Sequence, residues 1–330
     1  MVISALSKGF SSIWCLPGSH YCSFLPNLVL YILCSEYSDF LNRVFITQYR
    51  YGYPAFLTLC QVLLTWFILE WLRFFQWTSI QPYSLEVGEI LLLPSICFSF
   101  HSILSLWAVT NAPFTSYMLI IRFMPLVNLI LAHLFTIKSK PSLRETFIVI
   151  IVTLCSIITG VQNFHDDAIT YVYGLLGLAF ESFYLTLIQK TKEDQRLSAV
   201  NIHYTCVINS VPILVVLCLI HPDTLKALAS GSWLSLIFLG FFSLLLILGC
   251  ILKFLICFCA CQSSAVTVGM MDIAKRDTMT LRSLLPYKQS SLSLPFLTSL
   301  FISLSGIGIY AYGHYIDILP VPSVLNGHFI

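Results

Sequence analysis

The chain has 330 residues, of which 58% are hydrophobic and only 10% are charged. Such a composition lies far outside the range of water-soluble proteins, and repeated runs of about 20 apolar residues predict membrane-spanning helices. The formal net charge of +2 says little about partners beyond the lipid bilayer, and no nucleic-acid partner is expected.

The apolar runs predict helices because they are continuous, whereas the strands of a membrane barrel alternate between apolar and polar residues. Charged, proline and glycine clusters bound the runs. In chain order we expect ten transmembrane helices at 25–47, 54–75, 89–109, 114–136, 145–161, 170–189, 201–220, 233–259, 263–284 and 293–315. The connections are short, so the fold class is an all-α polytopic membrane protein without a separate soluble domain.

The two halves of the chain are weakly alike. Segments 134–143 and 284–293 each lead into an apolar helix with small residues at its centre, Thr153–Ser156 in one and Ser303–Gly306 in the other. We therefore expect repeats at 24–162 and 163–315, flanked by tails at 1–23 and 316–330. Since each repeat has five helices, the second must be inverted relative to the first. Chance similarity between apolar helices is the alternative.

Basic residues near the helix ends predict the orientation in the membrane. If the N-terminus is cytosolic, that side collects Lys8, Arg73, Lys138, Lys140, Arg144, Lys190, Lys192 and Arg196, and both tails face the cytosol. Most of the twelve cysteines fall in apolar runs and are expected to be buried thiols. No metal site, cofactor or enzyme motif is expected, because the chain has no CxxC pair, GxSxG, HExxH or P-loop.

The densest run of ionised residues lies inside the ninth predicted helix. At about 100° per residue, Asp272, Lys275, Arg276 and Arg282 share one face, and Asp277 points elsewhere. Each such charge costs roughly 2.5–3.5 kcal/mol at mid-membrane, so this face must contact protein or water. Its excess of positive charge, +2 in all, suits a diphosphate. The alternative is an ion cluster that neutralises itself.

Two other helices carry charges of interest. Arg122 stands alone in the fourth helix, three residues before Pro125, where a guanidinium suits bidentate phosphate recognition or reaches toward the membrane interface. Glu36, Asp39 and Arg43 in the first helix predict ion pairs that hold it against the bundle.

Single charges and aromatic residues complete the set of candidates. Lys253 and Glu181 pair across the bundle if the faces of the eighth and sixth helices meet, or else Lys253 extends to the cytosolic interface. Tyr204 could stack on a base, although aromatic residues in membrane helices more often pack or anchor at the interface. His101 receives no role.

Several scattered positions together resemble one transporter family. They are Asn42-Arg43 with the turn Tyr51-Gly52-Tyr53-Pro54 and Gln61, Asn111–Thr115 through Pro125, Ser264-Ala265-x-Thr267 with Lys275, and Ser305-Gly306. In these the chain resembles the nucleotide-sugar transporters of the drug/metabolite transporter superfamily, in particular the UDP-sugar and GDP-mannose branch.

The resemblance implies an antiporter that moves a nucleotide sugar, most directly a UDP-sugar, into the Golgi or endoplasmic reticulum lumen in exchange for a nucleoside monophosphate. It implies alternating access about a mid-membrane site, and it leaves a monomer and a homodimer open. Phosphate contacts are then expected from Lys275 and Arg276, offset by Asp272, and from Arg122. The further expected substrate-binding residues are Asn42, Arg43, Tyr204, Thr205 and Lys253.

Two departures from the family pattern keep alternatives open. The seventh helix reads His203-Tyr204-Thr205 where the family often has Phe-Tyr-Asn, and Asp272 stands where the family often has glycine. One alternative is a smaller organic phosphate as the exchanged ligand, as in the related triose-phosphate carriers. The other is a membrane scaffold or inactive paralogue that transports nothing.

Overall fold

The computed structural model describes residues 24–49, 53–111, 114–136, 140–161, 168–220, 223–229, 231–284 and 294–318. The predicted tail 1–23 and most of the tail 316–330 lie outside these residues. Helices alone make up the regular secondary structure of the described residues: α2 (Phe24–Tyr49), α3 (Pro54–Phe74), α4 (Leu85–Ile90), α5 (Leu92–Asn111), α6 (Phe114–Ile121), α7 (Met124–Phe135), α8 (Leu143–Val161), α9 (Ala168–Gln195), α10 (Ala199–Ile220), α11 (Asp223–Ala229), η1 (Gly231–Leu234), α12 (Leu236–Gln262), α13 (Ala265–Leu284) and α14 (Leu294–Ile318).

The predicted all-α polytopic class is confirmed. Within the described ranges, seven helical spans are long and apolar enough to cross a membrane: α3, α6 with α7, α8, α9, α10, α12 and α14. The third predicted helix contains a shorter apolar helix, Leu92–Ala108. The two remaining predicted spans, α2 and α13, fall outside this set and carry the charges of the first and ninth segments. The chain is a multi-pass membrane protein.

The fourth predicted helix is broken rather than continuous. It ends as α6 at Ile121 and restarts as α7 at Met124, so Arg122 lies in a two-residue break and not inside a helix. Pro125 explains the break, because its ring excludes the preceding turn of an α-helix and it has no backbone N–H to donate. The chain bridges the gap with tighter bonds, in which the N–H groups of Arg122 and Phe123 donate three residues back.

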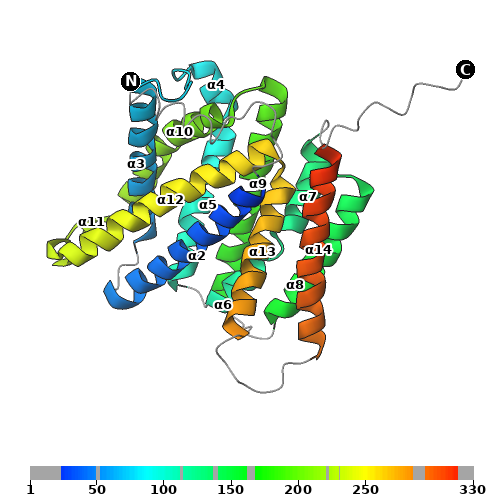
Figure 1. Cartoon of the computed structure of the whole chain (residues 1–330). Coiled ribbons are helices and arrows are strands. Elements are labelled where there is room, and N and C mark those ends of the chain that lie inside the picture. Colours follow the sequence, from blue (N-terminus) through cyan, green and yellow to red (C-terminus); the bar gives the residue numbers. More distant parts are fainter. Residues whose placement is uncertain are drawn as a thin grey trace, which may run out of the picture.

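The helices pack as a bundle with two pairs at its front. Figure 1 shows α2 and α12 side by side across the front and α13 upright between them and α14. Behind these, α5 packs on α9, α8 on α14, α3 on α10, and α7 on both α13 and α9. The main apolar core joins α3, α5, α9, α10 and α12 around fully buried residues such as Val62, Leu185 and Ile202.

One glycine sets the distance between α13 and the start of α7. A Cβ atom on Gly269 would come within 2.9 Å of the Cα of Pro125, which is backbone that cannot rotate away. By contrast, a Cβ on Gly308 in α14 would meet nothing within 4 Å. Close packing of the broken segment against α13 therefore depends on Gly269.

We expect Gly269→Ala to destabilise the protein by about 1–3 kcal/mol, since overpacking forces the backbone of α7 to shift. The matched control Gly308→Ala should be neutral or stabilising by up to about 1 kcal/mol, because alanine favours the helix and space is free. Thermal unfolding of the detergent-solubilised variants measures both. Equal melting temperatures for the two variants would contradict the close contact.

Candidate functional site

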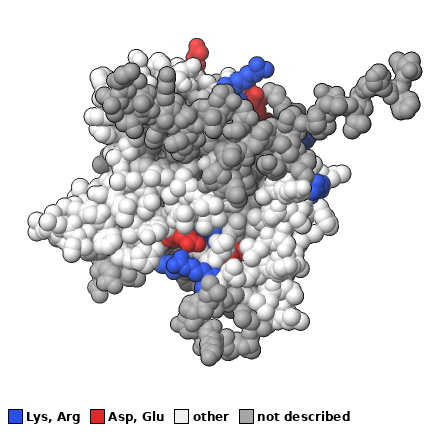
Figure 2. Space-filling model, in the orientation of Figure 1, with Lys and Arg blue, Asp and Glu red and all other residues white. Residues whose placement is uncertain are grey.

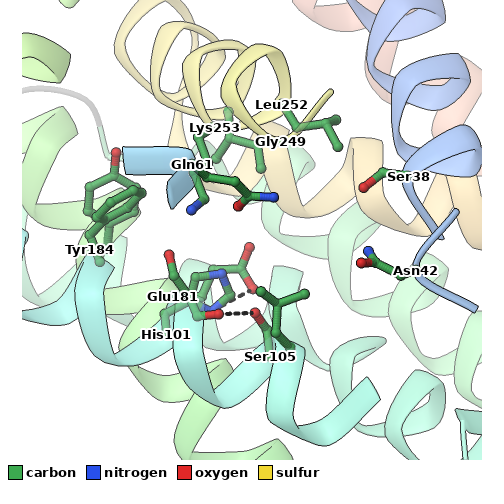
Figure 3. Close-up of a pocket in the computed structure, with 14 residues that line it drawn as sticks. Ser38, Asn42, Gln61, His101, Ser105, Glu181, Tyr184, Gly249, Leu252 and Lys253 are labelled. Carbon is green, nitrogen blue, oxygen red and sulfur yellow. Dashed lines mark hydrogen bonds and ion pairs between the residues drawn. The ribbon is translucent and has the colours of Figure 1, made fainter. Parts of the chain in front are cut away.

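A small cavity of about 160 Å³ lies between α2, α3, α5, α9 and α12. Polar side chains line it from every one of these helices (Figure 3). The polar and charged lining residues are Ser38, Asn42, Gln61, His101, Ser102, Ser105, Glu181, Tyr184 and Lys253. Ser38, Gln61, His101, Glu181 and Lys253 lie in the central third of their helices, so the cavity is near the middle of the bundle.

Lys253 is the cation of this cavity. Its Nζ atom is buried and has no hydrogen-bond partner among the described residues. The ammonium lies 5.4 Å from the centre of the Phe98 ring, close enough for a cation–π contact. An ammonium shielded from water without an anionic partner is costly, so a ligand that supplied negative charge would find a strong partner here.

Glu181 and His101 form the opposite wall (Figure 3). His101 Nδ1 lies 3.6 Å from a carboxylate oxygen of Glu181, and 3.3 Å from the carbonyl oxygen of Gly177. The predicted pairing of Glu181 with Lys253 is therefore replaced by pairing with His101, although both side chains reach the same cavity. His101, which the sequence left without a role, is part of the site.

Gln61 completes the cavity wall beside Lys253. Its Nε2 donates to the carbonyl oxygen of Leu245 at 3.4 Å. The side chain lies directly against Gly249, where any Cβ atom would collide with the amide. Gly249 thus leaves room for an amide group in the cavity lining.

Two ion pairs join α2 to α13 next to this cavity. Lys275 Nζ lies 2.7 Å from Asp39, and both side chains are largely buried. Arg282 pairs with Glu36 at 3.2 Å, with the arginine 78% exposed. In Figure 2, blue and red atoms meet in an otherwise white surface below the middle of the molecule. The expected charge of +2 counted α13 alone, and α2 supplies two carboxylates that offset it.

The other charges of this face are also paired. Arg276 Nε donates to Asp272 at 2.7 Å within α13, and its Nη1 also contacts the sulfur of Met118. The hydroxyl of Tyr31 on α2 donates to Asp272 at 3.3 Å. Glu181 lies within electrostatic range of Lys275 and Arg276, which places this ion cluster beside the cavity. Asp272 thus offsets the charge of Arg276, and the two carboxylates of α2 offset those of Lys275 and Arg282.

Arg122 and Asp277 form a deeper polar contact. Arg122 Nη1 donates to Asp277 at 2.7 Å and to the carbonyl oxygen of Ser156 at 2.9 Å, and it also contacts the Ser156 and Thr159 hydroxyls. Ser303 donates to the same carboxylate. Asp277 is 0% exposed and Arg122 is 5% exposed. Asp277 points away from the cluster, as expected, and its carboxylate neutralises Arg122.

The remaining predicted residues lie in different places. Asn42 lines the cavity, whereas Tyr204 and Thr205 are buried in α10 and are not among its lining residues. Tyr204 donates to Glu70 at 2.6 Å and accepts from Arg73 at 2.7 Å, near the end of α3. Arg43 is exposed on α2.

Three closely spaced cysteines of α12 are buried free thiols. Cys257, Cys259 and Cys261 are each at most 6% exposed. In the described part of the chain, no cluster of three or more His, Cys, Asp or Glu side chains is arranged to hold a metal ion.

Comparison with known proteins identifies a related transporter. The chain is 28% identical over 251 residues to UDP-galactose/UDP-glucose transporter 7 of Arabidopsis thaliana, and the match covers 75% of this chain and 76% of that protein. No family model matches. One solved crystal structure superposes with a TM-score of 0.54 at 11% identity, covering 87% of this chain and 98% of the other, which shows a shared fold alone. The resemblance to nucleotide-sugar transporters is confirmed.

Proposed function

We propose that this protein exchanges a nucleotide sugar, most directly a UDP-hexose, for a nucleoside monophosphate across the Golgi membrane, with the endoplasmic reticulum as the alternative site. The observation that carries the proposal is its similarity to a UDP-galactose/UDP-glucose transporter over three quarters of the chain. The cavity supports it, since a central polar cavity with a buried cation suits an anionic, hydroxyl-rich ligand. Both termini are proposed to be cytosolic.

The proposed architecture is ten spanning segments in two inverted repeats. The segments of one half are α2, α3, α5, α6 with α7, and α8, and those of the other are α9, α10, α12, α13 and α14. If the equivalent segments of the two halves are exchanged, the contact of α5 with α9 becomes that of α12 with α2. In the same way, the contact of α5 with α10 becomes that of α12 with α3. All four contacts are present. The pairs α3–α10, α7–α13 and α8–α14 map onto themselves, as expected for a twofold relation.

The ion pairs explain how α2 and α13 can cross a membrane despite their charges. An unpaired Asp, Lys or Arg costs roughly 2.5–3.5 kcal/mol at mid-membrane, whereas facing helices that carry opposite charges shield one another. Asp39 of α2 with Lys275 of α13 provides this neutralisation between helices, and Asp272 with Arg276 provides it within α13. This supports counting both helices among the spanning segments.

The small size of the cavity supports assigning the structure to an empty state that has not yet opened for the ligand. Pockets for drug-sized ligands measure roughly 300–1,000 Å³, so a cavity of about 160 Å³ must widen to take a nucleotide sugar. We propose that α2 moves away from α13 on loading, which separates Asp39 from Lys275. In this proposal Lys253 already faces the cavity in the empty state, and Lys253 and Lys275 both contact the diphosphate once the cavity has opened.

The other predicted residues take supporting roles in this proposal. Asp272 holds Arg276 beside Lys275, and Arg122 with Asp277 fixes the break in the fourth segment against α8, α13 and α14. Tyr204 with Glu70 and Arg73 holds α10 to the end of α3. Direct substrate contact is assigned to the cavity residues Lys253 and Asn42, and to Lys275 after opening.

The decisive experiment is uptake by purified protein in proteoliposomes preloaded with UMP. We expect saturable uptake of UDP-glucose or UDP-galactose that depends on internal UMP and exceeds that of GDP-mannose. The small cavity also favours a second candidate, a carrier of small organic phosphates. Competition by phosphoenolpyruvate stronger than competition by UDP would support that carrier. No uptake and no nucleotide-dependent thermal stabilisation would leave the scaffold alternative.

A further inference from the structure

The cavity has two chemically opposite walls. Lys253, with a buried and unpartnered Nζ, and the Gln61 amide lie on one wall, whereas Glu181 and His101 face it from the other (Figure 3). A site for a diphosphate alone has no use for a buried carboxylate, because like charges repel at close range. The Glu181 wall must therefore receive a different part of the ligand.

Carboxylates suit sugar hydroxyls, since each of the two oxygens accepts hydrogen bonds from O–H donors. His101 lies 3.6 Å from Glu181 and is itself held at 3.3 Å from the Gly177 carbonyl oxygen, so the carboxylate is oriented by a fixed neighbour. Resting on the proposed function, we infer that Glu181 binds the hexose hydroxyls and selects neutral sugars against sugars that carry a carboxylate.

Charged and titratable groups on three helices surround Glu181. His101 faces it from α5, Lys253 shares the cavity from α12, and Lys275, Arg276 and Asp272 act on it from α13. Burial opposes the ionised carboxylate, whereas the positive charges of Lys275 and Arg276 favour it and Asp272 opposes it. A uronic acid in the same place would set its own carboxylate against Glu181, because Lys253 and Lys275 are engaged by the diphosphate and Arg276 is paired with Asp272.

The test compares UDP-glucose and UDP-glucuronate as competitors of labelled UDP-glucose uptake in proteoliposomes. In the wild-type protein, UDP-glucuronate should compete at least about tenfold more weakly. Glu181→Gln should narrow this gap to within about threefold, since the amide still bonds to hydroxyls but no longer repels an anion. Glu181→Asp, which keeps the charge, should retain the gap. Glu89→Gln, an exposed carboxylate on α4, is the control and should leave it unchanged.

The outcomes separate this inference from the proposed function. UDP-glucose uptake with equal competition by UDP-glucuronate in the wild-type protein overturns the role of Glu181 and leaves nucleotide-sugar transport standing. A tenfold difference in competition that persists in a folded Glu181→Gln protein also overturns the role of Glu181 and leaves nucleotide-sugar transport standing. If Glu181→Gln does not fold, the wild-type and Glu181→Asp ratios decide. Absence of any nucleotide-sugar uptake overturns both proposals.

Discussion

Asp277→Ala is expected to lower the free energy of unfolding by about 3–5 kcal/mol, because it leaves the buried guanidinium of Arg122 without a counter-ion. The geometry makes this the most demanding pair in the protein. Asp277 is fully buried, its carboxylate accepts from Arg122 at 2.7 Å, and Ser156 donates to it at 3.2 Å. A carboxylate with this many donors cannot be removed without stranding them.

The control for this prediction is another Arg–carboxylate pair, which joins α13 to α2 and is exposed. Arg282 contacts Glu36 at 3.2 Å but is 78% exposed, so water can replace the carboxylate. Arg282→Gln should therefore cost no more than about 1 kcal/mol. Each variant removes one charged partner of an ion pair on α13, and the two pairs differ in burial.

A compensating double variant tests the cause. Arg122→Met with Asp277→Leu removes both buried charges and should recover most of the stability that Asp277→Ala loses. Thermal and denaturant unfolding in detergent provide the measurement. If Asp277→Ala proves no more damaging than Arg282→Gln, the buried ion pair does not stabilise the bundle as described.

Apolar runs with their charged, proline and glycine boundaries predicted where the helices lie. The ten predicted segments coincide with helices of the described residues, the fourth of them broken at Arg122, since apolar runs leave the backbone no other way to satisfy its hydrogen bonds in lipid. The break at Arg122 was also within reach, because Pro125 three residues later has no N–H and disfavours a continuous helix.

The partners of the charges were not predictable to the same degree. The spacing of Asp272, Lys275 and Arg276 on one helix shows that they share a face, but not which helix covers that face. Asp39 reaches Lys275 because α2 packs on α13, which depends on the tilt and rotation of two helices far apart in sequence. The charge of +2 was therefore correct for that face of α13 and misleading for the site.

The cavity was the least predictable feature. Lys253, Glu181 and His101 come from three helices, and Lys253 and Glu181 were each the single charge in an apolar run. Only the packing of α5, α9 and α12 shows that they face one space. One signal was available in the sequence: polar residues in the middle of membrane helices rarely face lipid, so each pointed inward.

Lys253→Met is expected to reduce uptake of the nucleotide sugar at least about 30-fold, since a lost charge contact to a phosphate costs 2 kcal/mol or more. The same change should leave stability unchanged or raise it. Nζ of Lys253 is buried without a hydrogen-bond partner among the described residues. Removing its desolvation penalty of several kcal/mol outweighs the loss of a cation–π contact with Phe98, which contributes about 0.5–2 kcal/mol.

A loss of uptake without a loss of stability distinguishes a binding residue from a structural one. Replacing a lysine that merely held helices together would lower both the stability and the uptake of the protein, as replacing Asp277 should. Lys140→Met, which removes an exposed lysine before α8, is the control and should change neither. Undiminished uptake by Lys253→Met, with uptake lost in Lys275→Met, would move the phosphate contact from the cavity to the ion cluster. Uptake lost only in Lys253→Met would place the first phosphate contact in the cavity. A buried cation that lowers the stability of the fold must serve another purpose, which here is ligand binding.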